Sequence, residues 1–132
     1  MSGDADSPIV VRGAMRTIEY AVCSNGSMPA REFIEGELSL AEQAKLLALF
    51  QRMADHGNVP NREQFKVVRG KVFEFKKHQI RVFCFRKDDR WLLTNGCKKK
   101  KDRLAPSEVA RAERIMEEHL RREADRHERR TR

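Results

Sequence analysis

Cationic side chains are concentrated in one stretch of the sequence, residues 65–104. This stretch holds 14 Lys and Arg against 4 Asp and Glu, whereas the whole chain of 132 residues carries a net charge of only +8. Such a concentration suits a polyanionic partner, most often nucleic acid. His78 is the only histidine in the stretch, and an imidazole can transfer protons near neutral pH. The residues therefore predict a polyanion-binding surface; the alternatives are a solvated basic face and an exposed turn histidine.

The composition excludes several other kinds of site. The chain has three cysteines, Cys23, Cys84 and Cys97, and no CxxC pair, which argues against a disulfide framework or a zinc knuckle. We find no carboxylate cluster for magnesium and no Gly-rich phosphate loop, so no cofactor is expected. The segment Met1–Pro8 is acidic and polar, unlike a secretory signal, and no apolar run approaches a membrane span. A cytoplasmic protein without a membrane partner is expected.

The first half of the chain predicts one strand and two helices. Polar and apolar residues alternate along Met15–Cys23, as in a strand. Pro29 suits the first turn of a short helix. Ser39 and Glu42 have the spacing of a capping box for a second helix, which Gly57 ends. These helices form the expected N-terminal helical hairpin.

The second half predicts three antiparallel strands and a last helix. The strands are Lys71–Lys76, Ile80–Arg86 and Trp91–Asn95, separated by turns short enough for hairpins. Trp91 is expected to pack in the core, with base stacking as the alternative. The last helix runs from Pro106 to about Leu120.

The chain therefore divides into three expected segments. Residues 1–13 form an N-terminal tail, residues 14–120 the folded domain, and residues 121–132 a charged C-terminal tail or helix extension. His119 and His127 have no metal-ligand spacing and are expected to be solvated. The expected fold class is α+β: the helical hairpin and the C-terminal helix pack on a small twisted antiparallel sheet.

Several segments, taken in order, resemble one known family. The run Lys71–Phe85 is similar to the strand pair of RelE/HigB-type toxins. Trp91–Gly96, the twin lysines Lys98 and Lys99, and Pro106–Ala112 resemble the strand, loop and terminal helix of the same toxins. The resemblance covers about residues 15–120 and points to the phage-derived branch of the RelE/ParE superfamily; the upstream residues that share it are Gly26, Pro29, Phe33, Leu38 and Gly57.

This resemblance implies a RelE-like fold and a function. The chain would be the toxin of a type II toxin–antitoxin system, an mRNA endoribonuclease that acts without metal, on the ribosome or on free mRNA. Its partners would be mRNA and a cognate antitoxin, often a helix-turn-helix repressor. The alternatives are a ParE-like toxin that poisons DNA gyrase without catalysis, and a non-toxic nucleic-acid-binding module.

The resemblance also implies site residues. Arg81 stands where the family has a phosphate-binding arginine, and its planar fork suits phosphate. The alternative is an ion pair between Arg81 and Glu74, which stands where some relatives have lysine. Well-studied relatives use an aromatic residue or histidine near the C-terminus, but Tyr20 is the only tyrosine here. The expected catalytic residues are Arg81, His78, Lys98 and Lys99, and the expected nucleic-acid-binding residues are Lys71, Lys76, Lys77, Lys100, Lys101 and Arg103.

Overall fold

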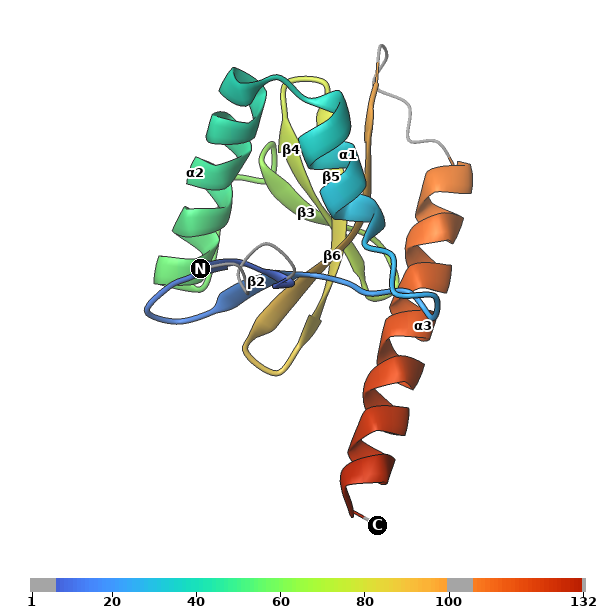
Figure 1. Ribbon diagram of the computed structural model, residues 1–132. Coiled ribbons are helices and arrows are strands. Elements are labelled where there is room, and N and C mark those ends of the chain that lie inside the picture. Colours follow the sequence, from blue (N-terminus) through green and yellow to red (C-terminus); the bar gives the residue numbers. More distant parts are fainter. Residues whose placement is uncertain (1–6, 100–105, 132) are drawn as a thin grey trace.

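The computed structural model describes residues 7–99 and 106–131. Strands and helices alternate in groups, with two strands first, then two helices, four strands and a long helix (Figure 1). In chain order they are β1 (Ile9–Arg12), β2 (Thr17–Tyr20), α1 (Pro29–Glu37), α2 (Leu40–His56), β3 (Phe65–Arg69), β4 (Val72–Lys77), β5 (Ile80–Lys87), β6 (Arg90–Lys98) and α3 (Pro106–Thr131).

One six-stranded mixed sheet forms the centre, with the strand order β1-β2-β6-β5-β4-β3. All neighbouring strands are antiparallel except β2 and β6, which are parallel. The protein is α+β, but the expected small antiparallel sheet with an N-terminal helical hairpin is wrong. A β1–β2 hairpin precedes the helices. Strand β2 also pairs with β6, the last strand of the chain, and residue alternation along a strand does not reveal such a distant partner. Strand β3 was also missed, because charged and exposed residues break its apolar pattern.

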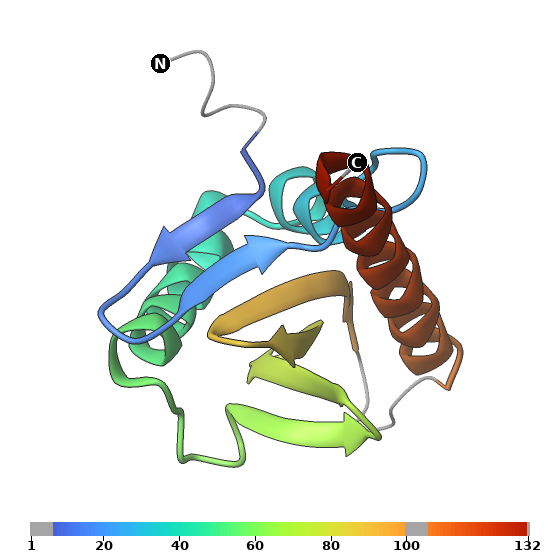
Figure 2. The same ribbon diagram turned by 90° about the horizontal axis from the view of Figure 1, so that it is seen from below.

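Helices cover both faces of this sheet (Figure 2). Along β5, Val82 and Cys84 belong to the core that α1 and α2 cover. The alternate residues Phe83 and Phe85 pack against α3 instead. Because successive strand residues point to opposite faces, α3 lies on the face opposite α1 and α2. Trp91 is buried in the α1–α2 core, as expected.

The ends of α2 confirm the sequence signals that predicted them. The Ser39 hydroxyl accepts a hydrogen bond from the Glu42 N–H at 3.1 Å, and the Glu42 carboxylate accepts one from the Ser39 N–H at 2.9 Å. Gly57 closes the helix in the left-handed conformation, at φ 74°. Within the described residues, no helix has the length and apolar character needed to cross a membrane.

A buried histidine fastens α3 to the sheet. The expectation that His119 is solvated is wrong: its side chain is 5% exposed and packs edge-on against Phe85. The Val22 N–H donates a hydrogen bond to His119 Nδ1 at 2.9 Å, and Glu123 lies 2.9 Å from Nε2. Because Nδ1 accepts a hydrogen bond here, the ring must be neutral with its hydrogen on Nε2, which donates to Glu123.

Burial lowers the pKa of His119 from its usual value of 6.5, although the nearby Glu123 carboxylate opposes this shift. The folded protein therefore favours the neutral ring. As pH falls below 6.5, the unfolded chain takes up this proton before the folded chain does, so the free energy of unfolding decreases. A second decrease follows below 4.5, where Glu123, whose pKa is lowered mainly by its hydrogen bonds from Arg90, begins to take up a proton in the unfolded chain.

We predict that His119→Asn reduces the loss of stability between about pH 6.5 and 4.5. The asparagine keeps an acceptor for the Val22 N–H but does not titrate. Urea unfolding at a series of pH values measures this. His127→Asn, an exposed histidine on the same helix, is the control and should keep the wild-type pH dependence. An unchanged slope in His119→Asn would contradict this role for His119.

Candidate nucleic-acid interface

Arg81 is buried at the start of β5, on the sheet face that α3 partly covers. Its side chain is 6% exposed. The guanidinium donates hydrogen bonds to the His78 carbonyl at 2.7 Å and to the Ile80 carbonyl at 3.2 Å. Its Nε lies 4.0 Å from Glu74 Oε1. The ion pair between Arg81 and Glu74, which was the alternative to a phosphate-binding role, is therefore present.

Glu74 is a buried carboxylate in the middle of β4. Its side chain is only 2% exposed, and Lys66 Nζ lies 3.9 Å from its second oxygen, Oε2. Among the described residues, Oε1 has no hydrogen-bond partner. A buried carboxylate oxygen without such a bond loses its hydration without full compensation. Glu74 thus keeps an open acceptor position between two cations.

These side chains line a cleft of about 480 Å³. Three strands contribute: Lys66 comes from β3, Lys76 from β4 and Arg81 from β5. Lys99, which directly follows β6, completes the set of cations from this sheet. At the rim, Lys76 Nζ lies 3.5 Å from the exposed carboxylate of Glu63. We call this hollow the Arg81 cleft; its lining residues are Arg62, Glu63, Lys66, Val67, Val68, Glu74, Lys76, Arg81 and Lys99.

The first turns of α3 pack on the same sheet face as the Arg81 cleft. Val109 packs on Phe83, and the Asn95 side chain donates a hydrogen bond to the Glu108 carbonyl at 3.2 Å. From Phe83 to Arg81 the strand continues by two residues on the same face, toward the cleft. Charged side chains follow the apolar contacts at this point. The packing of α3 therefore separates an apolar core from a cationic cleft on a single sheet face.

The twin lysines point to different parts of the molecule. Lys99 is 9% exposed and lines the Arg81 cleft. Lys98 is exposed, and its Nζ lies 3.2 Å from Glu42 at the start of α2. This is the pattern expected of successive residues on an extended chain, which alternate between faces. The structure thus brings Lys99, but not Lys98, together with Arg81.

The remaining predicted residues lie around the cleft or outside the described part of the chain. His78 is exposed in the β4–β5 turn at φ 54°, and only its carbonyl contacts Arg81. Lys71 is exposed in the β3–β4 turn, and Lys77 is half-buried at the end of β4. Neither lysine is among the residues that line the cleft, whereas Lys76 is. Three predicted residues, Lys100, Lys101 and Arg103, lie outside the described residues.

Sequence reasoning missed Arg62, Glu63 and Lys66 as neighbours of the cleft. Lys66 is the cross-strand partner of Glu74 in the β3–β4 pair, so an assignment of β3 would have placed it. Glu74 itself was considered only as a partner of Arg81. The signal for it is a carboxylate inside an otherwise apolar and basic strand, where only a paired charge is tolerated.

Two further observations bear on the chemistry of this face. Burial raises the pKa of the Cys97 thiol, and Glu108 adds to this while Lys99 opposes it. Cys97 is therefore held as a thiol and not as a nucleophilic thiolate. Within residues 7–99 and 106–131, no group of three or more His, Cys, Asp or Glu side chains is arranged to hold a metal ion.

We predict that Arg81→Ala destabilises the fold by about 3 kcal/mol, because it leaves the Glu74 carboxylate buried without one of its two cations. The double variant Arg81→Met/Glu74→Gln, which removes both charges, should regain most of this loss. Urea unfolding of the two variants measures the difference. A double variant as unstable as Arg81→Ala would contradict a coupled pair.

Comparison with known families identifies the chain. The family described as Phage derived protein Gp49-like matches residues 36–117, which run from the end of α1 into α3. This span includes every strand that lines the Arg81 cleft. No curated protein matches the chain. Since the match covers more than half of the sequence, the protein belongs to the Gp49-like phage-derived family, which is part of the RelE/toxin-type superfamily.

Proposed function

We propose that this chain is the toxin of a type II toxin–antitoxin pair and that it binds and cuts RNA in the Arg81 cleft. Its family is compatible with a toxin of such a system. The observation that carries the proposed activity is the buried Glu74 carboxylate, which faces Arg81 in a cleft otherwise rich in cations. A general base beside phosphate-binding cations is what RNA cleavage requires.

RNA supplies its own nucleophile for this reaction. The 2′-oxygen attacks the adjacent phosphorus, a new O2′–P bond forms and the P–O5′ bond breaks. The products are a 2′,3′-cyclic phosphate and a 5′-hydroxyl, so no oxidant or water is consumed. The enzyme must take a proton from the 2′-hydroxyl, give one to the leaving O5′ and stabilise negative charge on the phosphate.

The cleft offers a residue for each task. Glu74 is the proposed base, because Oε1 lacks a hydrogen-bond partner among the described side chains and can accept a proton from the 2′-hydroxyl. Arg81 presents a planar guanidinium, which suits the non-bridging phosphate oxygens. Lys99 is the proposed proton donor to O5′, and Lys76 binds a neighbouring phosphate at the rim. His78 could also transfer a proton, provided that the β4–β5 turn moves toward bound RNA.

The partners follow from the same surface. A cognate antitoxin, in this proposal a helix-turn-helix repressor, would inhibit the toxin by covering the cleft or by keeping it from mRNA on the ribosome. Lys71 and Lys77, which do not line the cleft, would extend the contact with mRNA. Electrostatic attraction of this kind weakens as salt increases, because bound phosphates release their counterions.

We predict that expression of the wild-type chain in a bacterial host arrests growth with rapid loss of intact mRNA. Glu74→Gln should slow RNA cleavage by at least about 100-fold, because it removes the general base while keeping shape and size. Glu63→Gln, a carboxylate at the exposed rim, is the matched control and should stay within a few-fold of wild type. RNA integrity in the host and cleavage of a purified transcript provide the two measurements.

Each other outcome identifies a different function. Growth arrest with DNA damage and stable RNA would indicate gyrase poisoning, and no growth effect would indicate a non-toxic binding module. Full cleavage by a folded Glu74→Gln variant, checked by thermal unfolding, would remove Glu74 from the mechanism.

A further inference from the structure

The last part of α3 extends beyond the sheet (Figure 1). Ile115, Met116 and Leu120 are the last apolar residues of this helix that pack in the core on its face of the sheet. Residues 121–131 continue the helix and carry five arginines. We call this segment the α3 extension. It lies after residue 117, where the match to the Gp49-like family ends.

Arginines take over the inward-facing stripe of α3 in this extension. Ala112, Ile115 and His119 are buried, and they mark the helix face that packs on the sheet. Continuing at helical spacing of three and four residues, the same face carries Arg126 and Arg130. Both are exposed. The helix face that packs in the core up to Leu120 therefore carries cations in the extension.

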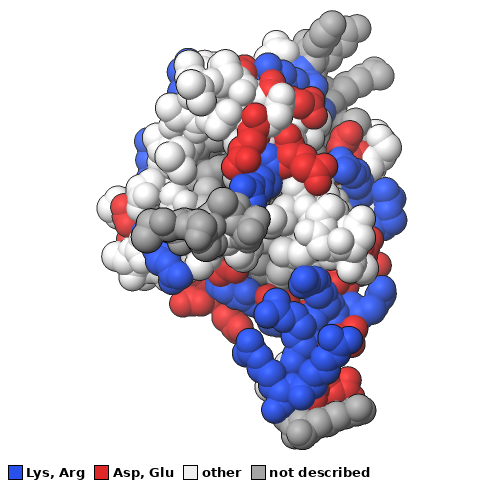
Figure 3. Space-filling model, viewed as in Figure 1, with Lys and Arg blue, Asp and Glu red and all other residues white. Residues whose placement is uncertain are grey.

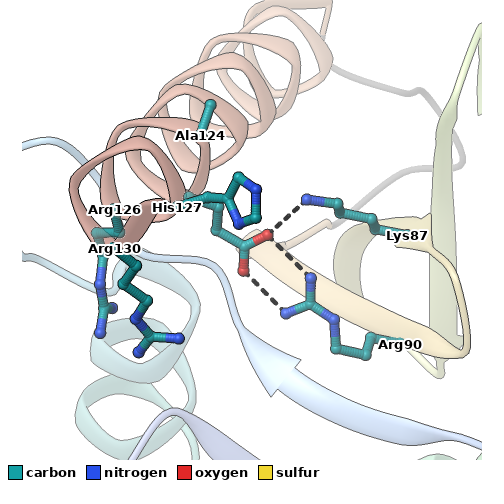
Figure 4. Close-up of a pocket in the computed structure, with 7 residues that line it drawn as sticks. Lys87, Arg90, Ala124, Arg126, His127 and Arg130 are labelled. Atoms are coloured by element: carbon teal, nitrogen blue, oxygen red, sulfur yellow. Dashed lines mark hydrogen bonds and ion pairs between the residues drawn. The ribbon is translucent and has the colours of Figure 1, made fainter. Parts of the chain in front are cut away.

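These two arginines border a hollow of about 530 Å³ between α3 and the β5–β6 hairpin. Figure 4 shows them together on the helix side, across from Lys87 and Arg90. The residues that line this hollow are Lys87, Arg90, Glu123, Ala124, Arg126, His127 and Arg130.

Glu123 neutralises only the hairpin side of the hollow. Its carboxylate accepts hydrogen bonds from Nη1 and Nη2 of Arg90, each at 2.9 Å, and from Lys87 Nζ at 2.9 Å. These hydrogen bonds raise the pKa of Arg90 and lower that of Glu123, so the cluster is held charged. Arg126 and Arg130 have no ion-pair or hydrogen-bond partner within residues 7–99 and 106–131. Their charge therefore remains available to a ligand.

Other arginines reinforce the charge of this end of the molecule. Arg121, Arg122 and Arg129 line a second hollow of about 390 Å³ on the α3 extension. Figure 3 shows Lys and Arg side chains gathered over this end, with few acidic side chains among them. Arginines therefore predominate around the second hollow, whose lining also includes Asp125.

We infer that the α3 extension is a binding surface for the phosphate backbone of double-stranded RNA. Arg126 and Arg130 lie one helical turn apart, about 6 Å along the axis, so two planar guanidinium groups face the same ligand. The residues that line the hollow include no Phe, Tyr or Trp, and His127 supplies its one ring. Single strands are usually bound with aromatic stacking, whereas duplex RNA is recognised by its backbone and shape. The choice of RNA over DNA rests on the proposed function.

This surface is separate from the Arg81 cleft. Arg81 and Lys87 lie near opposite ends of β5, six residues apart, or about 20 Å at 3.3 Å per residue. One RNA molecule with a paired region and a single strand can contact both. The extension would then supply affinity and orientation while the cleft supplies the chemistry.

The test is binding of the full-length chain to a 16-base-pair RNA duplex, measured by fluorescence anisotropy over a range of salt concentrations. Arg126→Gln/Arg130→Gln should weaken binding and lower the slope of log K against log salt by about 2, one for each lost phosphate contact. Arg111→Gln/Arg114→Gln makes the same charge change at exposed positions earlier in α3, and should leave the slope unchanged. Arg126→Lys/Arg130→Lys should retain the slope, because it retains the charge.

Three results would overturn the inference. The first is an equal slope in the Arg126→Gln/Arg130→Gln and Arg111→Gln/Arg114→Gln variants. The second is loss of the slope in Arg126→Lys/Arg130→Lys, which would indicate a structural effect. The third is equally tight binding of a duplex DNA or of a poly-glutamate peptide, which would assign the surface to another polyanion. None of these depends on cleavage, so a chain that fails to cut RNA in the host still gives a decisive answer here.

Discussion

The candidate site depends on one buried interaction, the Glu74 carboxylate held between Arg81 and Lys66. Burying such charges costs free energy of desolvation, and an apolar pair of similar size is often at least as stable. The cleft therefore keeps its charges at a cost to stability, which is the usual relation between a functional site and its scaffold.

The way α3 crosses the sheet leaves this pair outside the apolar contact of the helix. The helix covers the face from Phe83 onward and leaves the start of β5 to charged side chains. Strand β3 adds Lys66 from the edge of the sheet, and alternation after β6 sends Lys99 into the cleft. At the other end of α3, His119 and Glu123 bind the helix to Val22, just after β2, and to the β5–β6 hairpin. The same helix thus bounds one cationic surface and carries another.

Local sequence signals predicted the local structure well. The Ser39–Glu42 capping box and Gly57 located α2, and apolar segments separated by short turns located β4, β5 and β6. The parallel β2–β6 pair could not be read in this way, because strand direction depends on a contact between residues more than 70 positions apart. The α+β class was right, yet the number of strands and the purely antiparallel sheet were not.

The candidate site was predicted only in part, because it too depends on contacts between residues far apart in the sequence. Charge density located the basic stretch, and Arg81, Lys76 and Lys99 lie together in it. Charge density does not distinguish the two faces of a strand, so it could not separate Lys98 from Lys99. It also drew attention away from acidic residues, although Glu74 is the most buried charged group of the cleft. The position of His119 depends on tertiary packing against Phe85 and Val22, which periodicity within one helix does not specify.

The central claim is that the Arg81 cleft is where an RNA strand is bound. Two-dimensional NMR of the full chain, titrated with a single-stranded RNA whose 2′-hydroxyls are replaced by hydrogen to prevent cleavage, tests this most directly. We expect the largest shift changes at the backbone amides of Lys66, Glu74, Lys76, Arg81 and Lys99, with little change at Lys98 and α2. Shift changes confined to α1 and α2, or absent from the cleft at saturating RNA, would contradict the account.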